Sequence, residues 1–262
     1  MLAAQRRWEP VLGAAGAQAA ELGEELFVLL DALTSSGSLR RTLTDPSLGA
    51  EAKEALVARL LADADPRVVQ AAQWLVGARW SSEDDLAEAV EHLAYEALLA
   101  AAGAVGELQR VEEELFILTR ALAGQRELRR ALADLRVPAE VRGGIVDTLL
   151  DGEASPVTAA LARRAAVAPR GRRFVAVLGH LGDLVAERRS LQVATVSAAG
   201  PLSAAQQERL ADLLQQTYGQ AIQLNVIVDP DVLGGLRVQI GPDVIDATVL
   251  ARLADARRRL AS

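Results

Sequence analysis

Glu24–Leu61 reads EELFVLLDALTSSGSLRRTLTDPSLGAEAKEALVARLL, and the chain contains a second, similar segment. The second occurrence, Glu113–Leu150, reads EELFILTRALAGQRELRRALADLRVPAEVRGGIVDTLL, with no gap and a constant offset of 89 residues (113 − 24). The two segments are identical at 17 of 38 positions. These identities include Phe27 with Phe116 and two Arg-Arg pairs, which a bias toward Ala and Leu would not produce. The chain therefore contains an internal duplication.

Each copy is predicted to form a small bundle of helices. In the second copy, apolar residues recur at helical spacing from Leu115 onward, and a short helix is expected over 126–134. Pro138 suits the first turn of a third helix, and Ser155 caps a fourth.

The two copies are expected to be joined without a flexible linker. No proline occurs between Ser82 and Val137, and Ser82 is a candidate cap. The helix that starts at Glu83 is therefore expected to run on past Ala100.

Composition supports a mainly helical chain whose core is built from Ala, Leu and Val, since 51% of residues are hydrophobic but only 3% are aromatic. The net charge of −7 argues against a nucleic-acid-binding protein. The absence of cysteine excludes disulfides, thiolate metal sites and a Cys nucleophile. No apolar run is long enough to span a bilayer, and no hydrophobic signal region follows Arg6 and Arg7. Membrane association is therefore expected to run through a partner.

The last third of the chain has a different pattern, typical of a small α+β domain. Its apolar residues alternate in short segments separated by Gly and Pro, which favours strands, and a capping box favours one helix between them. The expected order is a strand at Gln192–Ser197, a helix from Ser203 to about Tyr218, strands at Ala221–Asp229 and Leu236–Ile240, an extended Val244–Asp246, and a closing helix at Thr248–Leu260.

This last stretch resembles the C-terminal domain of the ATP synthase delta subunit, called the oligomycin-sensitivity-conferring protein in mitochondria. The family pattern is an acidic residue after a hydrophobic strand, Leu or Met before a small-Gly pair, an alternating strand, then Gly-x-x-Val-Ile-Asp and a helix with an Arg. The matching positions are Asp229, Leu233, Gly234, Gly235, Leu236, Val238, Gly241, Val244, Ile245, Asp246 and Arg252.

Residues from about Glu88 onward would supply one complete member of this family, and the residues before them would be an extra copy of its helical bundle. Such an added bundle resembles the actinobacterial form of the subunit. The expected fold is mainly α, with two tandem homologous helical bundles, 1–87 and 88–189, followed by a small α+β domain at 190–262.

The resemblance implies a mechanical role rather than catalysis. A delta subunit belongs to the stator of the F-type ATP synthase, links the catalytic head to the membrane-anchored stalk, and is needed for coupling proton flow to ATP synthesis. The implied partners are the N-terminal helices of the alpha subunits, bound by the helical bundle, and the b-type stalk subunit, bound by the C-terminal domain. No cofactor, metal or nucleic acid is implied, and the expected location is the cytoplasmic face of the plasma membrane, as a peripheral protein.

The resemblance also suggests which residues contact each partner. Tyr95, Leu115 and Phe116 are the candidates for binding the head. The candidates for stalk binding or for shaping the domain are the family-signature positions Asp229, Leu233, Gly234, Gly235, Val238, Gly241, Val244, Asp246 and Arg252. The second bundle is expected to hold the head, because its spacing to the C-terminal domain is that of an ordinary family member. The first bundle is expected to brace the stalk.

Several residues admit two interpretations. Phe27 and Phe116 are either partner anchors or core residues, and core packing is favoured. His92 and His180 occupy similar positions in the two copies and are either metal ligands or remnants of the duplication; the second interpretation is favoured, because a metal site would need more ligands. The arginines at Arg163–Arg164 and Arg170–Arg173 either bind anions or an acidic partner or form a solvated, charged surface, and the solvated surface is favoured.

Two alternative functions remain open from the residues alone. A generic helical scaffold would explain the duplication without any synthase. An enzyme would need convergent polar groups, and no Ser/His/Asp arrangement is visible. Gly234–Gly235 lacks the Lys-Ser/Thr of a phosphate-binding loop and is expected to be a bend in the chain.

Overall fold

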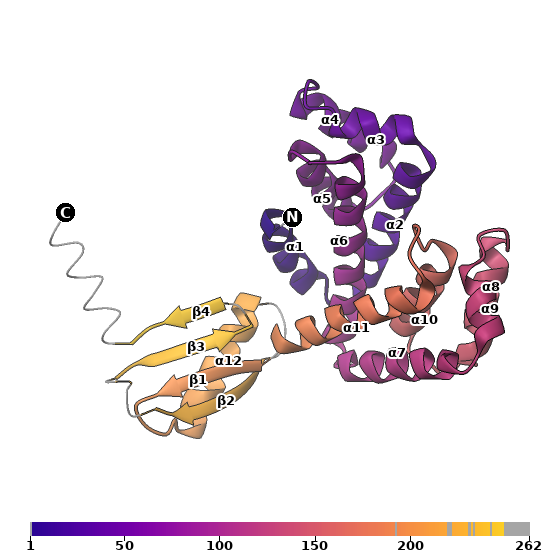
Figure 1. Ribbon diagram of the computed structural model, residues 1–262. Helices are drawn as coiled ribbons and strands as arrows, with labels where there is room; N and C mark the ends of the chain where they lie inside the picture. The colour runs from indigo at the N-terminus through magenta and orange to yellow at the C-terminus, as the bar shows by residue number, and fades with distance from the viewer. Residues whose placement is uncertain are drawn as a thin grey trace. The chain divides into compact units, whose positions relative to one another are not determined.

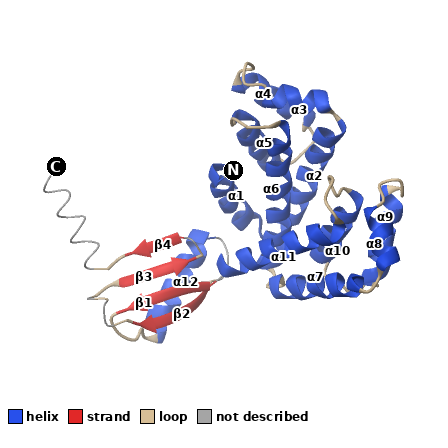
Figure 2. Ribbon diagram, in the orientation of Figure 1, coloured by secondary structure: helices blue, strands red, loops and turns tan. Residues whose placement is uncertain are grey.

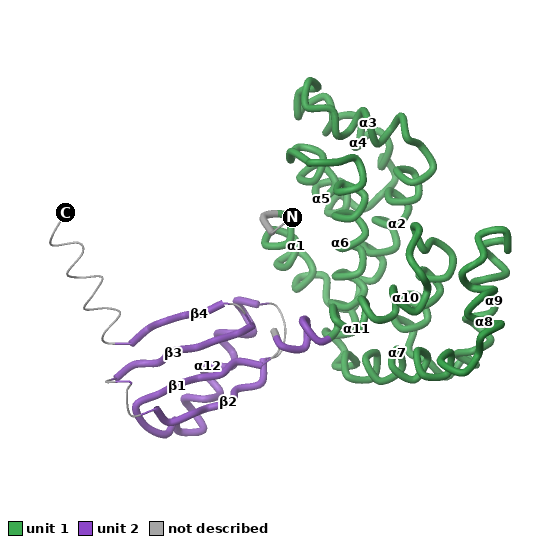
Figure 3. Tube along the Cα trace, viewed as in Figure 1, with its two compact units in different colours: residues 1–185 green, residues 186–262 purple. Residues whose placement is uncertain are grey.

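The chain forms two compact units in the computed structural model, residues 1–185 and residues 186–262 (Figure 3). The structure describes residues 2–191, 193–218, 222–229, 232, 234–241 and 243–248. Helices build the first unit, here called the helical unit, and the described strands all lie in the second, the α+β unit (Figure 2). The expected fold class, mainly α with a small α+β domain, is confirmed.

The helices of the helical unit follow one another through short loops (Figure 1). They are α1 (Leu2–Ala15), the 3-10 turn η1 (Gly16–Gln18), α2 (Ala19–Ser35), α3 (Gly37–Thr44), α4 (Ala50–Leu60), α5 (Pro66–Gly77), α6 (Glu83–Ala104), α7 (Leu108–Ala123), α8 (Arg126–Ala133), α9 (Ala139–Leu150), α10 (Pro156–Val167) and α11 (Phe174–Leu191).

The duplication recurs in the helices. α2 begins at Ala19 and α7 at Leu108, and α3 begins at Gly37 and α8 at Arg126, so both pairs keep the offset of 89 residues. We call α2–α5 the first repeat and α7–α10 the second repeat. The helices expected in the second copy from the short helix to the one that Ser155 caps are confirmed by α8, α9 and α10.

One long helix, α6, follows the first repeat and leads into the second. Its capping box is formed at Ser82, whose Oγ accepts a hydrogen bond from the backbone N–H of Asp85 at 3.2 Å, while Asp85 Oδ2 accepts one from the Ser82 N–H at 3.0 Å. The expectation that this helix continues past Ala100 is confirmed. The expected boundary at residues 87 and 88 lies inside α6, so the division into bundles at 1–87 and 88–189 stays a prediction.

Small residues let α2 and α6 pack closely. A Cβ added to Gly23 would lie 2.8 Å from the backbone oxygen of Ala94 and 3.2 Å from the Cβ of Ala97. Around this contact, buried Leu and Ala side chains from both repeats form one continuous core. The expectation of a core poor in aromatic residues is met because close helix approach, rather than large side chains, fills the interior.

Each repeat satisfies the start of its last helix in the same way. Glu25 of α2 accepts the backbone N–H of Asp65 at 2.7 Å, and Glu114 of α7 accepts the backbone N–H of Ser155 at 3.0 Å. Asp65 and Ser155 are the N-caps of α5 and α10. Helix N-termini leave N–H groups without intrahelical partners and favour nearby negative charge. The duplicated carboxylate therefore holds α5 against α2 in the first repeat and α10 against α7 in the second.

α1 was not predicted from the sequence. Pro10 lies inside this helix, where it removes one backbone hydrogen bond, so the segment carries a helix-breaking signal. Burial overrides that signal: Trp8 and Leu12 are almost fully buried, and the indole N–H of Trp8 donates to the carbonyl oxygen of Leu93 in α6 at 3.1 Å.

The α+β unit contains a four-stranded mixed sheet and one covering helix. The strands are β1 (Val193–Ala198), β2 (Gln223–Val228), β3 (Leu236–Ile240) and β4 (Asp243–Asp246), in the spatial order β2-β1-β3-β4. β1 pairs with β2 in parallel and with β3 antiparallel, and β3 pairs with β4 antiparallel. The parallel pair requires a crossover, which α12 (Ala204–Tyr218) provides.

Alternate residues along each strand point to opposite faces of the sheet, and one of these faces is buried. Ala194, Val196 and Ala198 of β1 point to one face, where they pack with Leu214 of α12 and with alternate residues of β3. The expected strands and the helix up to Tyr218 are confirmed. The expected closing helix, apart from Thr248, lies outside the described residues.

Candidate functional site

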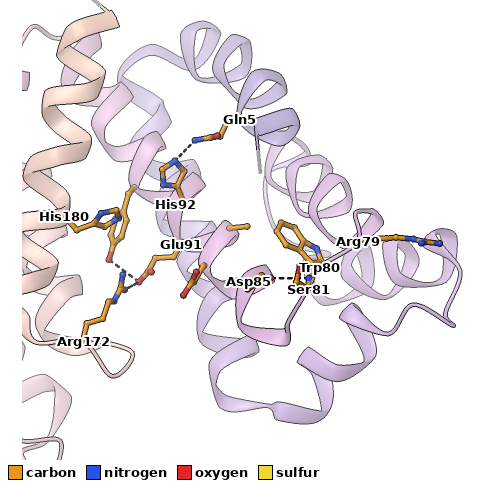
Figure 4. Close-up of a pocket in the computed structure, with 12 residues that line it drawn as sticks. Gln5, Arg79, Trp80, Ser81, Asp85, Glu91, His92, Arg172 and His180 are labelled. Carbon is orange, nitrogen blue, oxygen red and sulfur yellow. Dashed lines mark hydrogen bonds and ion pairs between the residues drawn. The ribbon is translucent and has the colours of Figure 1, made fainter. Parts of the chain in front are cut away.

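A buried carboxylate joins α6 to the loop between α10 and α11. Glu91 is 4% exposed, and its carboxylate oxygens pair with the guanidinium groups of Arg170, at 3.0 Å, and of Arg172. The hydroxyl of Tyr95 donates to Glu91 Oε1 at 3.3 Å. Figure 4 shows Arg172 and Glu91 pointing toward each other. A buried charge is tolerated only when it is paired, so this cluster ties the second repeat and α11 to the helix that both repeats share.

An open cavity of about 740 Å³ lies beside this cluster (Figure 4). His92 lies on its wall, with its Nε2 at 2.6 Å from Gln5 Nε2 and at 3.1 Å from Glu96 Oε1. His180 of α11 also lines it, and burial, followed by the nearby charge of Arg172, lowers the pKa of His180. Within the described residues, no group of three or more His, Cys, Asp or Glu could hold a metal ion.

The second repeat covers an aromatic face of the first. Phe27 on α2 is 3% exposed, and its ring lies 5.5 Å, edge to face, from the ring of Tyr95 on α6. The guanidinium of Arg164, from α10, lies 4.4 Å from the centre of the Phe27 ring. The same guanidinium forms a bidentate salt bridge with the Asp31 carboxylate, with N–O distances of 2.7 and 2.9 Å. A ring, a carboxylate and a covering guanidinium therefore form this contact between the repeats.

The equivalent face of the second repeat is open. Phe116 and Ile117 on α7 are 60% and 64% exposed, although Phe116 matches the buried Phe27 in the duplication. Arg120, one turn further along α7, lies over the Phe116 ring at 5.8 Å. The second repeat therefore leaves exposed a ring that the first repeat buries.

The exposure of these residues tests several of the sequence predictions. Core packing is confirmed for Phe27 and is wrong for Phe116, because the covering residues that bury Phe27 have no counterpart over α7. Of the three candidates for head binding, Tyr95 and Leu115 are 1% exposed and lie inside the core, and only Phe116 is on the surface. The head-binding role itself stays a prediction.

The expected solvated arginine surface is confirmed for Arg173, which is exposed, and is wrong for Arg164 and Arg170, which are 10% and 12% exposed. Arg163 pairs with Glu140 at 2.6 Å and with Asp147. Arg164, Arg170 and Arg172 pair with carboxylates of α2 and α6, as described above. The ion pairs of these arginines could not be predicted from the sequence, because their carboxylate partners lie 16 to 133 residues away in the chain.

The family-pattern positions of the α+β unit shape its turns. Gly235 has a φ of +83°, and a Cβ there would lie 2.4 Å from the carbonyl oxygen of Ala247, so the chain bends where only glycine fits. Gly234 lies in the same bend, which confirms the bend expected there, and Gly241, with φ of +54°, turns the chain between β3 and β4.

The remaining pattern positions divide between core and surface. Val238 is buried at 5% exposure, whereas Val244 is 53% exposed on β4. Asp246 accepts the Thr248 hydroxyl at 2.6 Å, which lowers the pKa of Asp246, and it pairs with Arg237 at 3.5 Å.

The other positions of the pattern are structural or outside the described part. The backbone N–H of Asp229 donates to the Ala198 carbonyl at 2.9 Å, which extends the β1–β2 pairing. Leu233 and Arg252 lie outside the described residues.

Among the residues that the structure describes, no helix combines the length and the apolar character that a bilayer crossing needs.

Comparison with known proteins identifies the chain's family. Residues 93–260 match the family model described as ATP synthase delta (OSCP) subunit. A protein of Beutenbergia cavernae named ATP synthase subunit delta is 51% identical over 99% of this chain and 96% of its own length. Proteins of the same name from Kineococcus radiotolerans and Streptomyces griseus are 45% and 41% identical, each over 100% of this chain and over 95% and 97% of their own length.

A chain of the solved Toxoplasma gondii mitochondrial ATP synthase hexamer matches 64% of this chain at 22% identity, with a TM-score of 0.32, which is too low to establish a shared arrangement. The family match covers the second repeat and the α+β unit, and the three bacterial relatives also align with the first repeat. The chain belongs to the ATP synthase delta (OSCP) subunit family.

Proposed function

We propose that this chain is the connector of the synthase stator, holding the catalytic head and the membrane-anchored stalk together so that the head cannot turn with the rotor. The family membership carries this proposal. The chain is a non-catalytic subunit of a proton-translocating ATP synthase, and coupling of proton flow to ATP synthesis depends on it.

The two units of the chain suit two attachments. The helical unit would bind N-terminal helices of the alpha subunits, by a helix packing onto its surface. The α+β unit would bind the end of the b-type stalk subunit. Release of one attachment leaves the other in place, so the freed site stays at a high effective concentration near its partner and rebinds. This arrangement resists torque better than one contact of the same total strength.

The two bundles would bind different partners. We assign the second bundle, residues 88–189, to the head, and the first bundle, residues 1–87, to bracing the stalk, with residues 190–262 as the stalk-binding domain. The open Phe116 face of the second repeat supports the first assignment, since the equivalent Phe27 face is already covered within the chain. The chain would lie peripherally at the cytoplasmic face of the plasma membrane, held there by its partners.

A binding experiment with the full chain tests this function. The immobilised chain is expected to retain the isolated catalytic head and the soluble part of the b-type stalk at the same time. Val244→Asp is expected to lose the stalk and keep the head, because Val244 is exposed on β4 at a position of the family pattern. Ile227→Asp is the matched control, since Ile227 is 46% exposed on β2 and is not one of the matching positions given for the family pattern. A chain that retains neither partner would contradict the proposal.

A further inference from the structure

Both histidines of the chain line one cavity. His92 of α6 and His180 of α11 are the only two in the sequence, and both lie on the wall of the open cavity of about 740 Å³ beside the Glu91 cluster. Imidazole is the side chain whose ordinary pKa, about 6.5, lies closest to neutral pH. A fall in pH from about 7.5 to about 5.5 therefore acts on this cavity while ordinary Asp and Glu side chains stay ionised.

The contact between His92 and Gln5 joins α6 to α1 and depends on the protonation of His92. Gln5 Nε2 lies 2.6 Å from His92 Nε2 and 3.0 Å from Glu96 Oε1, so its two hydrogens reach the imidazole nitrogen and the carboxylate. Figure 4 shows Gln5 and His92 pointing toward each other. An amide nitrogen only donates, so His92 Nε2 must offer a lone pair to this contact. The neutral imidazole is therefore the form that fits.

Protonation of His92 removes this acceptor. His92 Nε2 also lies 3.1 Å from Glu96 Oε1, one turn further along the same helix, and a protonated imidazole donates to that carboxylate. Gln5 then faces an N–H instead of a lone pair. Turning the Gln5 amide over does not restore the contact, because the amide oxygen would lie 3.0 Å from the Glu96 carboxylate. A proton on His92 therefore exchanges a bond between α1 and α6 for a bond within α6.

His180 makes the attachment of α11 to α6 sensitive to pH in the same direction. Partial burial and the positive charge of Arg172 lower the pKa of His180, and His92 adds to this effect. Glu91 and Asp183 act in the opposite direction. A histidine whose pKa is lowered by folding stabilises the folded chain above about pH 6.5, and this contribution disappears as the pH falls through the lowered value. A protonated His180 places a further positive charge beside Arg172, on the loop that ties α11 to α6.

Charged groups from the surrounding elements face the two histidines. Glu91 pairs with both Arg170 and Arg172, and α1 contributes Gln5, which is uncharged. The other groups that line the cavity or act on His180 are Asp85, Glu88 and Tyr95 of α6, Arg79 of the loop before α6, and Asp183 of α11. Because Glu96 contacts His92 directly, a protonated His92 finds a partner on α6 and not on α1.

We propose that this cavity is a proton-sensitive joint, in which protonation of His92 and His180 loosens α1 and α11 from α6. The helical unit is then held together most firmly at neutral pH and above. α1 begins the helical unit and α11 leads into β1, so the joint lies where the two ends of this unit meet α6. The inference concerns contacts within the helical unit and does not depend on the proposed function.

Urea unfolding of the full chain at about pH 7.5 and about pH 5.5, followed by tryptophan fluorescence, tests the joint. Between these pH values, the unfolding equilibrium constant of the unaltered chain is expected to rise about tenfold more than that of the double variant His92→Gln, His180→Gln. Glutamine still forms hydrogen bonds but does not titrate, and no imidazole is left in this variant. Equal pH dependence of the two chains would overturn the inference.

The matched control is Glu24→Gln. Burial raises the pKa of Glu24, and Arg164 partly offsets this effect, so Glu24 is a second group whose protonation changes as the pH falls toward 5. Glu24 lies on α2 and does not line the cavity. Glu24→Gln is expected to keep the histidine-dependent rise in the unfolding equilibrium constant. Loss of this rise in Glu24→Gln would assign the pH dependence to α2 and would also overturn the inference.

Nuclear magnetic resonance of the folded chain gives a second readout that does not rely on the stability of any variant. Because the chain has two histidines, one single variant assigns both imidazole signals. The side-chain amide signal of Gln5 is expected to shift with the titration of His92 in the unaltered chain and in His180→Gln, and to stay constant in His92→Gln. A Gln5 signal that stays constant in the unaltered chain while His92 titrates would show that the proton does not reach α1, and would overturn the inference.

Discussion

Glu91→Gln is expected to destabilise the helical unit strongly, because it leaves two arginines beside a neutral buried group. The Glu91 side chain is 4% exposed, and Arg170 is 12% exposed, so water can barely replace the lost charge. Breaking a buried ion pair costs about 3–5 kcal/mol. Arg172 is 36% exposed and can turn toward solvent, which lowers the expected loss of unfolding free energy to about 2–4 kcal/mol.

Tryptophan fluorescence gives a selective assay for this loss. The three tryptophans, Trp8, Trp74 and Trp80, all belong to the helical unit, so urea unfolding followed by their emission reports that unit alone. The expected change corresponds to a fall of roughly 5–15 °C in the thermal midpoint, since about 2–4 °C accompanies each kcal/mol in a unit of this size.

The matched control is Glu88→Gln, which makes the same charge change on an exposed residue one turn away in α6. It is expected to alter the unfolding free energy by less than about 0.5 kcal/mol. Replacing Glu91, Arg170 and Arg172 together by Met is expected to recover part of the loss, because no unpaired charge then stays buried. Equal stability of Glu91→Gln and Glu88→Gln would refute the claim that this cluster holds the second repeat and α11 to α6.

Two further predictions concern packing and protonation. Gly23→Ala is expected to cost about 1–3 kcal/mol in urea unfolding, because the new Cβ would lie 2.8 Å from the Ala94 oxygen, whereas Gly144→Ala on α9, with nothing within 4 Å, is expected to be neutral or stabilising. Hydrogen bonds from the Arg136 guanidinium and backbone lower the pKa of Asp134 from 3.8 to about 2, so its contribution to stability is present above pH 4 and disappears as the pH falls through about 2. An NMR titration of the Asp134 carboxyl should show this midpoint, and Arg136→Gln should move it toward 3.8.

The local elements of this fold could be predicted from the sequence, because their signals are local. Ser82, Ser155 and Ser203 indicate where helices start, because each side chain accepts a hydrogen bond from a backbone N–H three residues further along. The alternation of apolar and polar residues predicts β2 and β3. The duplication also predicted how helices would recur at an offset of 89 residues. α1 could not be predicted, because its stability comes from burying Trp8 against α6 while Pro10 signals a break.

The contacts between the repeats could not be predicted, and they decide which residues reach the surface. Phe27 and Phe116 are the same residue in matching segments, yet Arg164 from α10 covers only Phe27. Their different exposure comes from tertiary contacts that no spacing encodes. Because α6 packs on α2, deletion of residues 1–80 would expose an α6 face that is buried in the intact chain. Loss of stalk binding after that deletion would not distinguish a lost contact from unfolding, so point variants test the role of the first bundle more directly.

Proton pumping driven by ATP, in membranes depleted of this chain, tests the stator role most directly. Depleted membranes are expected to keep hydrolysing ATP while pumping no protons, and adding back the full chain is expected to restore pumping in proportion to the amount bound. An unrelated protein added at the same concentration should restore nothing. Depleted membranes that pump protons as efficiently per ATP as intact ones would contradict the account.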